Sequence, residues 1–454
     1  MSFPRYKKYK DSEVEWLGEV PAHWSVERLK FLATRIGSGK TPLGGSETYQ
    51  DSGVLFLRSQ NVHDDGLRLE DVVCIAQVVD DAMSSSRVQA GDILLNITGA
   101  SIGRTCIVPQ GFPPANVNQH VCVVRVSIPE QATFLAWLLK SAQIKAQIDY
   151  VQDGAAREGL NFQQIGSFNV PLPPVSEQAD ICRVLSEETA KIDTLVEEQK
   201  RLIELLKEKR RAVISRAVTK GLNPNAPMKD SGVEWLGEVP AHWDSSRLRY
   251  VARPGTSITY GIVQAGPHIE DGIPYIKTSD MSGPTLPCDG YSKTTAEIDA
   301  SYARSKVAAG DLVIAIRASV GKCLPVPAQL DGANLTQGTA KISPGDVIDA
   351  GFLLAYINAL PVQTYLNSVS KGATFKEITL DTLRKTPVLL PPLTEQRLIS
   401  SDVHGLNERF EALIDEAEAA EALLLERRAA LISAAVTGKI DVRGLVPQPE
   451  ALAA

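Results

Sequence analysis

The chain has 454 residues, of which 44% are hydrophobic and 22% are charged, and its formal net charge is −7 at pH 7. A chain of this length exceeds one hydrophobic core and predicts two to four domains of ordinary globular composition. The negative charge excludes a histone-like protein whose whole surface binds polyanions. It does not exclude DNA binding, because a protein that encloses DNA needs only a positive inner face.

The cysteines and the N-terminus exclude several other classes of protein. Six cysteines stand at positions 74, 106, 122, 182, 288 and 323. They form no CxxC pair and no Cys/His cluster of metal-ligand spacing, so the sequence predicts no metal site and no disulfide framework. The first residues lack an apolar signal core, and no apolar run reaches the length of a membrane span. We therefore expect a cytoplasmic protein without a membrane partner.

The first element along the chain is a Trp-rich motif that reveals an internal repeat. DSEVEWLGEVPAHW at 11–24 recurs at 230–243 with a single difference, and the register then continues with a shift of 219 that falls to 218. Further matching pairs are Ser-Ile-Gly-Arg at 101–104 with Ser-Val-Gly-Lys at 319–322, and LPPVSEQ at 172–178 with LPPLTEQ at 390–396. The chain is therefore a tandem duplication of one unit.

A mixed stretch follows each Trp-rich motif, at about 25–170 and 244–388. Short β-branched runs such as DILLNIT and DLVIAIR are separated there by Gly, Pro, Asn and Asp, which is typical of strands and turns. One amphipathic segment in each copy, 134–148 and 352–366, predicts one helix. Each stretch is therefore expected to form an α+β domain with a mainly β core.

A long helix is predicted to end each copy. Pro173-Pro174 or Pro391-Pro392 stops the last strand, and Ser176 or Thr394 can cap the helix start. About 42 residues without Pro or Gly follow in the first copy, which corresponds to a helix roughly 60 Å long. Apolar residues at alternating spacings of three and four predict a coiled-coil seam. The predicted seam residues are Leu185, Ile192, Leu195, Leu202, Leu206 and Val213 in the first helix, and Val403, Leu406, Phe410, Leu413, Leu424 and Leu431 in the second.

The charges of the two helices predict how they pair. The first helix is basic toward its C-terminal end, between Lys207 and Arg216, and the second is acidic through its first half, between Glu395 and Glu421. Only antiparallel packing brings these two stretches side by side. Such packing predicts globular domains at the two ends of a rod, related by a pseudo-two-fold axis. The alternative is that the helices pack on unrelated surfaces.

The predicted fold class is therefore α+β, with two similar domains separated by an antiparallel two-helix coiled coil. The expected segments are 1–24, an N-terminal segment; 25–175, the first globular domain; 176–220, the central helix; 221–243, a linker with the second Trp-rich motif; 244–393, the second globular domain; 394–438, the C-terminal helix; and 439–454, a tail.

The sequence carries no pattern that predicts catalysis in this chain. Gly37-Ser-Gly-Lys-Thr41 resembles the end of a phosphate-binding loop, but Thr34 stands where that loop requires glycine. The compared stretch of the second copy, which starts at Arg253, has no Gly-Lys-Thr, so we expect a flexible loop here. The chain has no GxGxxG opening a helix after a strand, no HExxH and no GxSxG pattern. The histidines form no constellation, and we expect each to be a packed or surface residue.

The two LPP-x-[Ser/Thr]-Glu-Gln motifs are each followed by a long helix and preceded by a Ser-x-Gly-Arg/Lys turn. In these features, and in WLGEVPAHW, the chain resembles the specificity subunit of type I restriction-modification systems over nearly its whole length. The resemblance implies two target recognition domains, each reading one half of a bipartite, asymmetric sequence of double-stranded DNA. It implies a helix pair that sets the unread gap. It also implies two modification subunits and restriction subunits as partners, which would bind S-adenosylmethionine, ATP and Mg; no cofactor is expected in this chain.

Residues that could contact DNA are predicted from their chemistry and their position in loops. Arg and Lys suit guanine, Asn and Gln suit adenine, and basic or hydroxyl groups suit phosphates. The candidates are Lys40, Thr41, Arg58, Ser59, Gln60, Arg104 and Arg157 in the first domain, and Tyr260, Gln264, Lys277, Thr278, Lys322, Lys371 and Lys376 in the second. Four repeated residues fit a structural role better than base reading: Asn116, Gln119, Asn334 and Gln337. The tryptophans of the repeated motif are expected to be packing anchors.

Two other functions stay open at this point. The chain could be a nuclease or methyltransferase with its own site, or a coiled-coil scaffold that joins proteins and ignores DNA. The absent motifs weaken the first, and the two large divergent domains weaken both.

Overall fold

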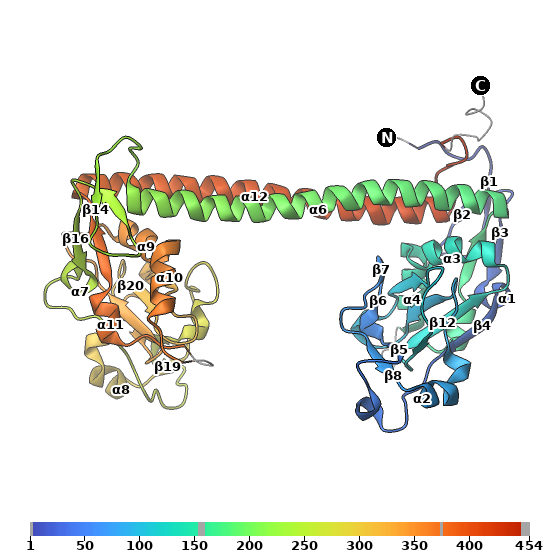
Figure 1. Cartoon of the computed structure of the whole chain (residues 1–454), viewed down its shortest axis with the longest axis horizontal. Helices are drawn as coiled ribbons and strands as arrows, with labels where there is room; N and C mark the ends of the chain where they lie inside the picture. The colour runs from blue at the N-terminus through green and yellow to red at the C-terminus, as the bar shows by residue number, and fades with distance from the viewer. Residues whose placement is uncertain (1–2, 153–158, 373–375, 446–454) are drawn as a thin grey trace. The chain divides into compact units, whose positions relative to one another are not determined.

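The computed structural model describes residues 3–152, 159–372 and 376–445 (Figure 1). The chain divides into two units, of which unit 1 comprises Met1–Gln199 and Ala419–Ala454 and unit 2 comprises Lys200–Glu418. Each unit thus takes its globular domain from one repeat and contains part of each long helix. The boundaries of the two units therefore fall inside the helices and not between the repeats.

Two small sheets form the core of unit 1. The first has four antiparallel strands in the order β10 (Thr105–Ile107), β9 (Ile93–Asn96), β12 (Val121–Val126) and β4 (Ala33–Ser38). The second has the order β11 (Ala115–Val117), β5 (Val54–Leu57) and β8 (Val73–Ile75), with β11 parallel to β5. A further pair, β3 (Ser25–Arg28) with β13 (Asn169–Leu172), closes the domain next to the long helices.

In unit 1 the central strand β9 is hydrophobic from Ile93 to Leu95 because both of its faces are covered. Ile93 and Leu95 belong to the main core cluster, together with residues of the covering helix α3 (Ala132–Leu139). Leu94, between them, belongs to a second cluster with Leu57 and Val117. Successive side chains of a strand point to opposite faces, so a strand covered on both faces favours apolar residues at successive positions.

Unit 2 repeats this architecture. Its four-stranded sheet has the order β17 (Thr259–Tyr260), β23 (Thr339–Ile342), β20 (Leu312–Ala315) and β21 (Cys323–Pro325). Its second sheet has the order β19 (Lys293–Thr294), β18 (Ile273–Ile276) and β22 (Asn334–Leu335), with β18 parallel to β22. The remaining pair is β16 (Asp244–Arg247) with β24 (Pro387–Leu390).

Each predicted amphipathic helix is in fact two helices, so the prediction of one helix per copy was wrong. Residues 134–148 fall in α3 and α4 (Ala142–Gln152), and residues 352–366 fall in α9 (Ala350–Asn358) and α10 (Leu360–Ser368). The break comes from the long helices. Ser433 accepts a hydrogen bond from the backbone N–H of Ala142 at 3.0 Å, and Ser215 accepts one from Leu360 at 3.1 Å.

The long helices are α6 (Val175–Lys220), with 46 residues, and α12 (Leu393–Val436), with 44. Each begins one residue before the predicted start. In unit 1, Arg428 of α12 pairs with both carboxylate oxygens of Asp193 of α6, at 2.7 and 3.2 Å. In unit 2, Arg210 of α6 lies 3.5 Å from Glu411 of α12.

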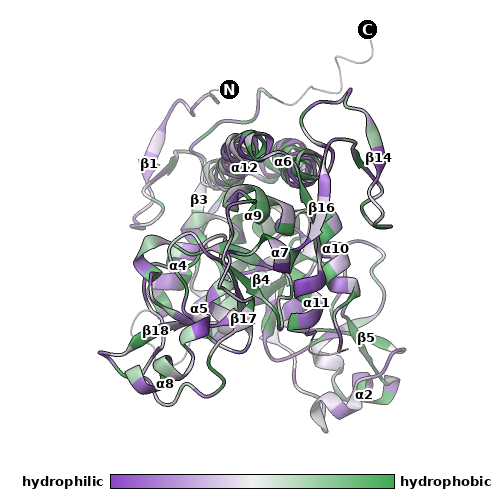
Figure 2. Ribbon diagram, turned by 90° about the vertical axis from the view of Figure 1, so that its left-hand side faces the viewer, coloured by the Kyte–Doolittle hydropathy of each residue, from purple (hydrophilic) through white to green (hydrophobic). Residues whose placement is uncertain are grey.

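Contacts within each unit show the direction of packing. In unit 1 the start of α6 and the end of α12 lie together, because Glu177 and Gly438 both lie against Trp24, and Asp193 meets Arg428 farther along both helices. In unit 2 the end of α6 lies beside the start of α12, because a Cβ at Gly221 would lie 3.4 Å from Glu395. In both units the two helices lie side by side, as Figures 1 and 2 show from two directions. The prediction of antiparallel helices is confirmed within each unit.

The helix seam agrees with the prediction at some positions. Leu185, Ile192 and Val403 are buried, as are Phe410 and Leu431. Four other predicted seam residues are half-buried: Leu206, Val213, Leu406 and Leu424.

Three predicted seam positions were wrong by one residue. Leu195, Leu202 and Leu413 are 44%, 43% and 47% exposed, and the buried residues are their neighbours Val196, Ile203 and Ile414. The cause is the repeat length. Buried positions recur every eleven residues, as from Leu185 to Val196, and eleven residues at about 3.67 per turn match a straight helix better than a heptad does.

The Trp-rich motif anchors the start of each long helix. Trp24 and Trp243 are fully buried, which confirms their predicted role as packing anchors. Glu177, in the first turn of α6, accepts hydrogen bonds from the Tyr6 hydroxyl at 2.5 Å and the Trp24 indole at 3.2 Å, and pairs with His23 at 2.8 Å. Burial and the adjacent Glu177 raise the pKa of Tyr6. The carboxylate also lies at the positive end of the helix dipole.

Unit 2 contains a weaker version of this anchor. Glu395 pairs with His242 at 2.8 Å, but the position that corresponds to Tyr6 holds Asn225. The indole N–H of Trp243 has no hydrogen-bond partner among the described residues. Glu177 is 5% exposed and Glu395 is 25% exposed.

Hairpins of the Trp-rich motifs also bind the ends of the long helices. In unit 1, Lys439 just after α12 donates to the carbonyl of Glu19 in β2 (Glu19–Pro21) at 2.7 Å. In unit 2, Lys220 at the end of α6 donates to the carbonyl of Leu236 at 3.3 Å. Each unit therefore joins the start of one long helix and the end of the other to the same motif. No helix among the described residues is long and apolar enough to cross a membrane.

The two anchors form a matched pair for measuring their contribution to stability. Glu177→Ala removes a buried carboxylate that has three partners, and it leaves the Trp24 and Tyr6 donors without an acceptor. We therefore expect it to lower the free energy of unfolding by about 3 kcal/mol. Glu395→Ala removes a partially exposed carboxylate with one partner and should lower the free energy of unfolding by about 1 kcal/mol. Chemical denaturation of the two variants measures both values, and equal losses would contradict the account.

Candidate nucleic-acid interface

The ends of four strands meet at one edge of unit 1. Ser38 at the end of β4 and Asn96 at the end of β9 pair with the first residues of β12. The parallel strands β5 and β11 end at the same place, where the N–H of Asn118 donates to the carbonyl of Leu57 at 3.0 Å. We define residues 39–41, 58–60, 97–104 and 118–120 as the strand-end edge of unit 1.

Six of the seven DNA-binding candidates of unit 1 lie at this edge. Lys40, Thr41, Gln60 and Arg104 are exposed there, whereas Arg58 and Ser59 are half-buried. The Arg58 guanidinium donates to the carbonyl of Asp71 at 2.8 Å and lies 5.7 Å from the Tyr49 ring. The seventh candidate, Arg157, lies outside the described residues. The sequence therefore selected residues from separate loops that the fold brings together.

The edge includes a chain of polar groups that the sequence reasoning missed. The Thr41 hydroxyl donates to the Gln119 amide oxygen, and the Gln119 amide nitrogen lies 3.0 Å from Nε2 of His120. The other ring nitrogen of His120 lies 2.6 Å from the Thr98 hydroxyl. His120 and Thr98 were not among the predicted DNA-binding residues. Their position just beside predicted strands is the sequence signal that could have found them.

The loop that carries Lys40 and Thr41 depends on a glycine. A Cβ atom at Gly39 would lie 1.6 Å from the carbonyl oxygen of Val117, and one at Gly261 would lie 2.0 Å from that of Leu335. Residues 261–263 are thus the structural counterpart of residues 39–41. The stretch that starts at Arg253, which the sequence comparison paired with this loop, is not its counterpart. A single 3-10 turn, Gly45–Thr48, follows this loop in place of the helix that a phosphate-binding loop requires.

Unit 2 has an equivalent edge with different side chains. The strand-end edge of unit 2 comprises residues 260–264, 277–278, 316–322, 336–338, 371–372 and 376–377. Ile262 pairs with Thr336, and the N–H of Thr336 donates to the carbonyl of Ile276 at 3.1 Å. The backbones of Lys371 and Glu377 pair with each other, and so do those of Arg317 and Glu377.

All seven DNA-binding candidates of unit 2 lie at this second edge. Tyr260, Gln264, Lys371 and Lys376 are exposed, and Lys277, Thr278 and Lys322 are half-buried. Lys277 donates to the Ser292 hydroxyl, and Lys322 donates to the carbonyl of Ser282 at 2.7 Å. The sequence reasoning missed Arg317, which pairs with Glu377 at 3.0 Å within this edge.

Two of the repeated polar residues have the structural role that was predicted. Asn116 and Asn334 are completely buried. Asn116 donates to Asp80 at 2.9 Å, and Asn334 donates to Asp299 at 2.8 Å. Each joins the second sheet to a helix of its own domain, so base reading by these residues is excluded by their burial.

The backbone of the unit 2 edge is strained at one residue. Ala318 has φ 61° and its counterpart in the first repeat, Gly99, has φ 70°. The left-handed region costs a non-glycine residue roughly 1–2 kcal/mol. The N–H of Ala318 donates to the carbonyl of Lys376 at 3.1 Å, so this conformation joins two segments of the strand-end edge.

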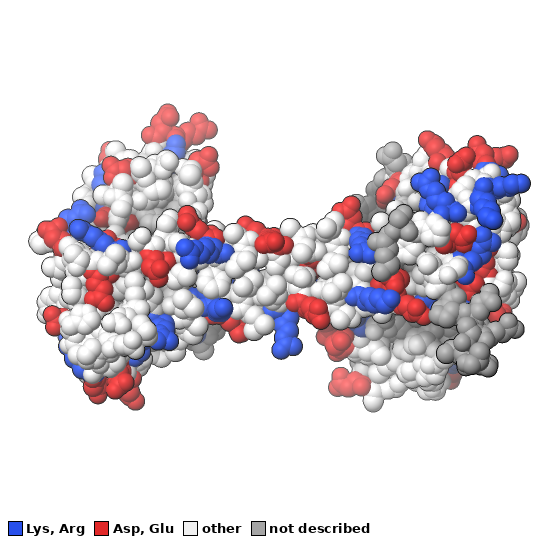
Figure 3. All heavy atoms as spheres, turned by 90° about the horizontal axis from the view of Figure 1, so that it is seen from above, with Lys and Arg blue, Asp and Glu red and all other residues white. Residues whose placement is uncertain are grey.

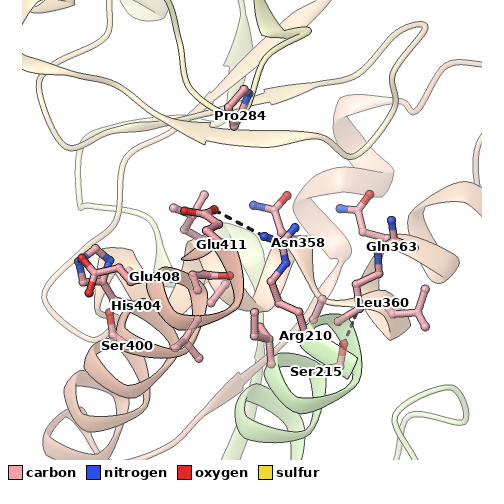
Figure 4. A pocket seen from close by; sticks show the side chains of 18 residues that line it. Arg210, Ser215, Pro284, Asn358, Leu360, Gln363, Ser400, His404, Glu408 and Glu411 are labelled. Carbon is pink, nitrogen blue, oxygen red and sulfur yellow. Dashed lines mark hydrogen bonds and ion pairs between the residues drawn. The ribbon is translucent and has the colours of Figure 1, made fainter. Parts of the chain in front are cut away.

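Unit 2 also has a cavity of about 810 Å³ where its domain meets the long helices (Figure 4). Its lining includes Arg210, Asn358 and Gln363, together with Ser400, His404 and Glu408 along one face of α12. In the first repeat, Lys140 and Lys145 replace Asn358 and Gln363, and Trp137 replaces Ala355. Lys140 lies 4.8 Å from the Trp137 ring centroid, and burial lowers its pKa. The cavity therefore results from side chains in unit 2 that are smaller than those at the corresponding positions of unit 1.

Ser400, His404 and Glu408 do not form a catalytic arrangement. No hydrogen bond joins Ser400 to His404 in the described residues, and His404 lies 3.4 Å from Glu408, with both side chains more than two-thirds exposed. No cluster of three or more metal-ligating side chains occurs in the part of the chain that the structure describes. The cysteines are free thiols, and burial raises the pKa of Cys106 and Cys122 to about 12.

The comparison with protein families decides whether the chain is an enzyme with its own site, a coiled-coil scaffold or a DNA specificity subunit. The family model of the type I restriction modification DNA specificity domain matches residues 23–205 and 265–416, which together make up most of the chain. The chain belongs to this family. The two matched segments correspond to the two repeats, so this is a tandem pair of specificity domains.

Relatives and solved structures agree with this assignment. The specificity subunit of the Escherichia coli type I restriction enzyme EcoBI is 25% identical over 74% of this chain and 72% of its own length. The MjaVIII specificity subunit of Methanocaldococcus jannaschii is 22% identical over 97% of this chain and 98% of its own.

The structural comparisons show that the fold is shared. The HsdS subunit of Thermoanaerobacter tengcongensis, at 19% identity, matches with a TM-score of 0.52 over 93% of this chain and 98% of its own. A chain from a structure of the assembly and conformational transition of the type I R-M system matches with a TM-score of 0.63. It is 20% identical and covers 92% of this chain and 98% of its own.

Membership of the family assigns the role of the specificity domains. The chain provides the DNA specificity of a type I restriction-modification complex, and catalysis lies in partner subunits. DNA and the other subunits of that complex are therefore its partners. The Ser400–His404–Glu408 face belongs to a recognition protein and not to an enzyme with its own site.

The strain at Ala318 can be measured against its glycine counterpart. Ala318→Gly should raise the free energy of unfolding of unit 2 by about 1 kcal/mol, because glycine adopts the left-handed conformation without steric cost. Gly99→Ala should lower the stability of unit 1 by a similar amount, since a Cβ there meets no atom within 4 Å and only the backbone conformation opposes it. Thermal unfolding measures both changes, and shifts of the same sign would show that the strain is absent.

Proposed function

We propose that each unit reads one half of a bipartite, asymmetric DNA sequence through its strand-end edge. The observation that carries the proposal is the contrast between scaffold and surface. Both units build the edge from the same strand ends, close-packed glycines and buried Asn–Asp contacts. The exposed side chains on it differ, as between Thr41 and Val263. A shared frame with different polar groups suits one task on two different base sequences.

The distribution of charge supports the same proposal. The chain as a whole is acidic, with a net charge of −7. The strand-end edge of unit 1 nevertheless exposes Lys40 and Arg104, and that of unit 2 exposes Lys371 and Lys376. Local basic groups on an acidic protein favour DNA binding at these edges over binding across the whole surface.

We also propose that the helix pair sets the unread gap between the half-sites. The helices α6 and α12 are each continuous through both units. At 1.5 Å per residue, helices of this length extend about 66–69 Å, roughly two turns of DNA. Their antiparallel packing in each unit supports a pseudo-two-fold relation, under which the two domains read the duplex in opposite strand senses.

Two modification subunits and the restriction subunits are proposed to dock on this framework. Exposed leucines occur on the long helices of both units: Leu195, Leu423 and Leu425 in unit 1, and Leu202, Leu205 and Leu413 in unit 2. The helix surface in Figure 3 shows charged side chains separated by uncharged surface. Such repeated apolar positions suit one partner that binds twice. These partners would hold S-adenosylmethionine, ATP and Mg, and the complex would act on the genome in the cytoplasm.

The assignment of one edge to each half-site is tested by removing charge from one edge. The double variant Lys40→Ala, Arg104→Ala should weaken or relax recognition at one half-site and leave the other unchanged. Methylated sites are mapped in DNA modified by the complex of each variant with its modification subunits. Lys371→Ala, Lys376→Ala is the matched variant for unit 2 and should affect the opposite half. Loss of specificity at both half-sites in either variant would contradict the proposal.

The role of the helix pair is tested by lengthening both helices equally. Two eleven-residue repeats inserted after Gln199 and two after Glu418 preserve the burial pattern and add about 33 Å to each helix. The unread gap should widen by about ten base pairs, close to one DNA turn, so that both half-sites keep the same face of the duplex.

The control has the same insertion in α6 alone. It destroys the pairing register and should abolish methylation. An unchanged gap in the doubly lengthened protein would refute the role of the helices.

A further inference from the structure

Gln119 and Gln337 occupy the same place in the two units. Gln119 lies in the turn between β11 and β12, and Gln337 lies in the turn between β22 and β23. Both belong to the strand-end edges. Their repetition in the sequence predicts the same structural role for both, but their hydrogen bonds differ between the units.

The side-chain amide of Gln337 is hydrogen-bonded to the backbone of its own domain. One end of the amide faces the carbonyl oxygens of Ile262 and Val263, and because carbonyls only accept, the amide is assigned with its nitrogen at this end, 3.0 Å from each. The backbone N–H of Gln337 also donates to the carbonyl of Ile262, at 3.1 Å. A primary amide has two N–H groups, and both are used here. Gln337 therefore fastens residues 262 and 263 to the turn and keeps no donor for a ligand.

The amide of Gln119 keeps half of its hydrogen-bonding capacity. Its oxygen accepts one hydrogen bond from the Thr41 hydroxyl, and its nitrogen donates one to the His120 ring at 3.0 Å. An amide oxygen can accept two hydrogen bonds, and the nitrogen can donate two. Gln119 is exposed, whereas Gln337 is half-buried. One donor and one acceptor of Gln119 thus remain available at the edge.

Neighbouring side chains contact both ends of the Gln119 amide. Its oxygen lies beside the Thr41 hydroxyl, and its nitrogen lies 3.0 Å from Nε2 of His120. Nδ1 of the same ring lies 2.6 Å from the Thr98 hydroxyl. These contacts restrain the amide before any ligand binds, which lowers the entropy cost of recognition.

A donor and an acceptor on one planar amide match adenine among the four bases. In the major groove adenine presents the N6 amino group as a donor and N7 as an acceptor, whereas guanine presents two acceptors. We propose that Gln119 reads an adenine–thymine pair in the half-site bound by unit 1, and that Gln337 reads no base. This inference rests on the proposed function, since it assumes that the strand-end edge of unit 1 faces DNA bases.

The test uses the complete complex of the chain with its modification subunits. Methylation is measured on a library of duplexes in which both half-sites are randomised, and the preference at each base position is read by sequencing. Gln119→Ala should reduce the preference for adenine–thymine at one position by roughly ten- to a hundred-fold. All other positions, including the whole half-site of unit 2, should keep their preferences.

Three further variants separate base reading from a structural role. Gln337→Ala is the matched variant. It removes contacts to the backbone of residues 262 and 263, so any effect should spread over the half-site of unit 2, with no selective loss of an adenine–thymine preference at one position and no change in the half-site of unit 1. Gln119→Glu has only acceptors, so the affected position should shift toward cytosine, whose N4 amino group is a donor. Thr41→Val removes the group that orients the amide oxygen and should relax the same position by a smaller factor.

The outcomes distinguish this inference from the proposed function. A wild-type complex without a bipartite preference would refute the proposed function itself. A bipartite preference that is unchanged in Gln119→Ala would refute only the role of Gln119. A change at a guanine–cytosine position, or at every position of the half-site, would also overturn it, because it would show that Gln119 supports the edge without reading adenine.

Discussion

The antiparallel packing of α6 and α12 is the constraint on which the rest of the structure depends. Neither helix can bury its apolar side chains alone, and each unit supplies the missing half from the other repeat. The core of unit 1 contains Leu431, Ile432 and Val436 of α12, and the core of unit 2 contains Ala217 and Val218 of α6. The core of each domain is therefore completed by the long helix of the other copy.

The contacts retained between the copies are those that hold this framework together. Ser433 and Ser215 lie on the long helices and cap the equivalent domain helices α4 and α10. Glu177 and Glu395 bind equivalent histidines, although Glu177 alone has the additional partner Tyr6. Differences gather where no such contact is needed: at the exposed parts of the strand-end edges and in the cavity of unit 2. Duplication thus preserved the frame while these exposed surfaces became different.

The sequence predicted the duplication, the α+β domains and the antiparallel helices, because each produces a repeated pattern of hydrophobicity or charge. It also selected residues that the fold gathers at two edges, from Lys40 and Arg104 to Lys371. What it missed depends on partners far away in the chain. The break before Ala142 comes from Ser433, which no local pattern reveals. Val196 replaces Leu195 in the seam because a heptad drifts from the geometry of a straight helix. The different roles of Gln119 and Gln337 appear only from their hydrogen bonds.

The central proposal is that the two domains joined by the antiparallel helices read the duplex in opposite strand senses. It is tested most directly by exchanging residues 25–170 with residues 244–388 within one chain and mapping the DNA that the resulting complex methylates. Under a two-fold relation the exchange is equivalent to turning the protein around on the duplex. The account therefore predicts the same double-stranded target, with the same gap. A target in which the two half-sites have changed places relative to each other would contradict it.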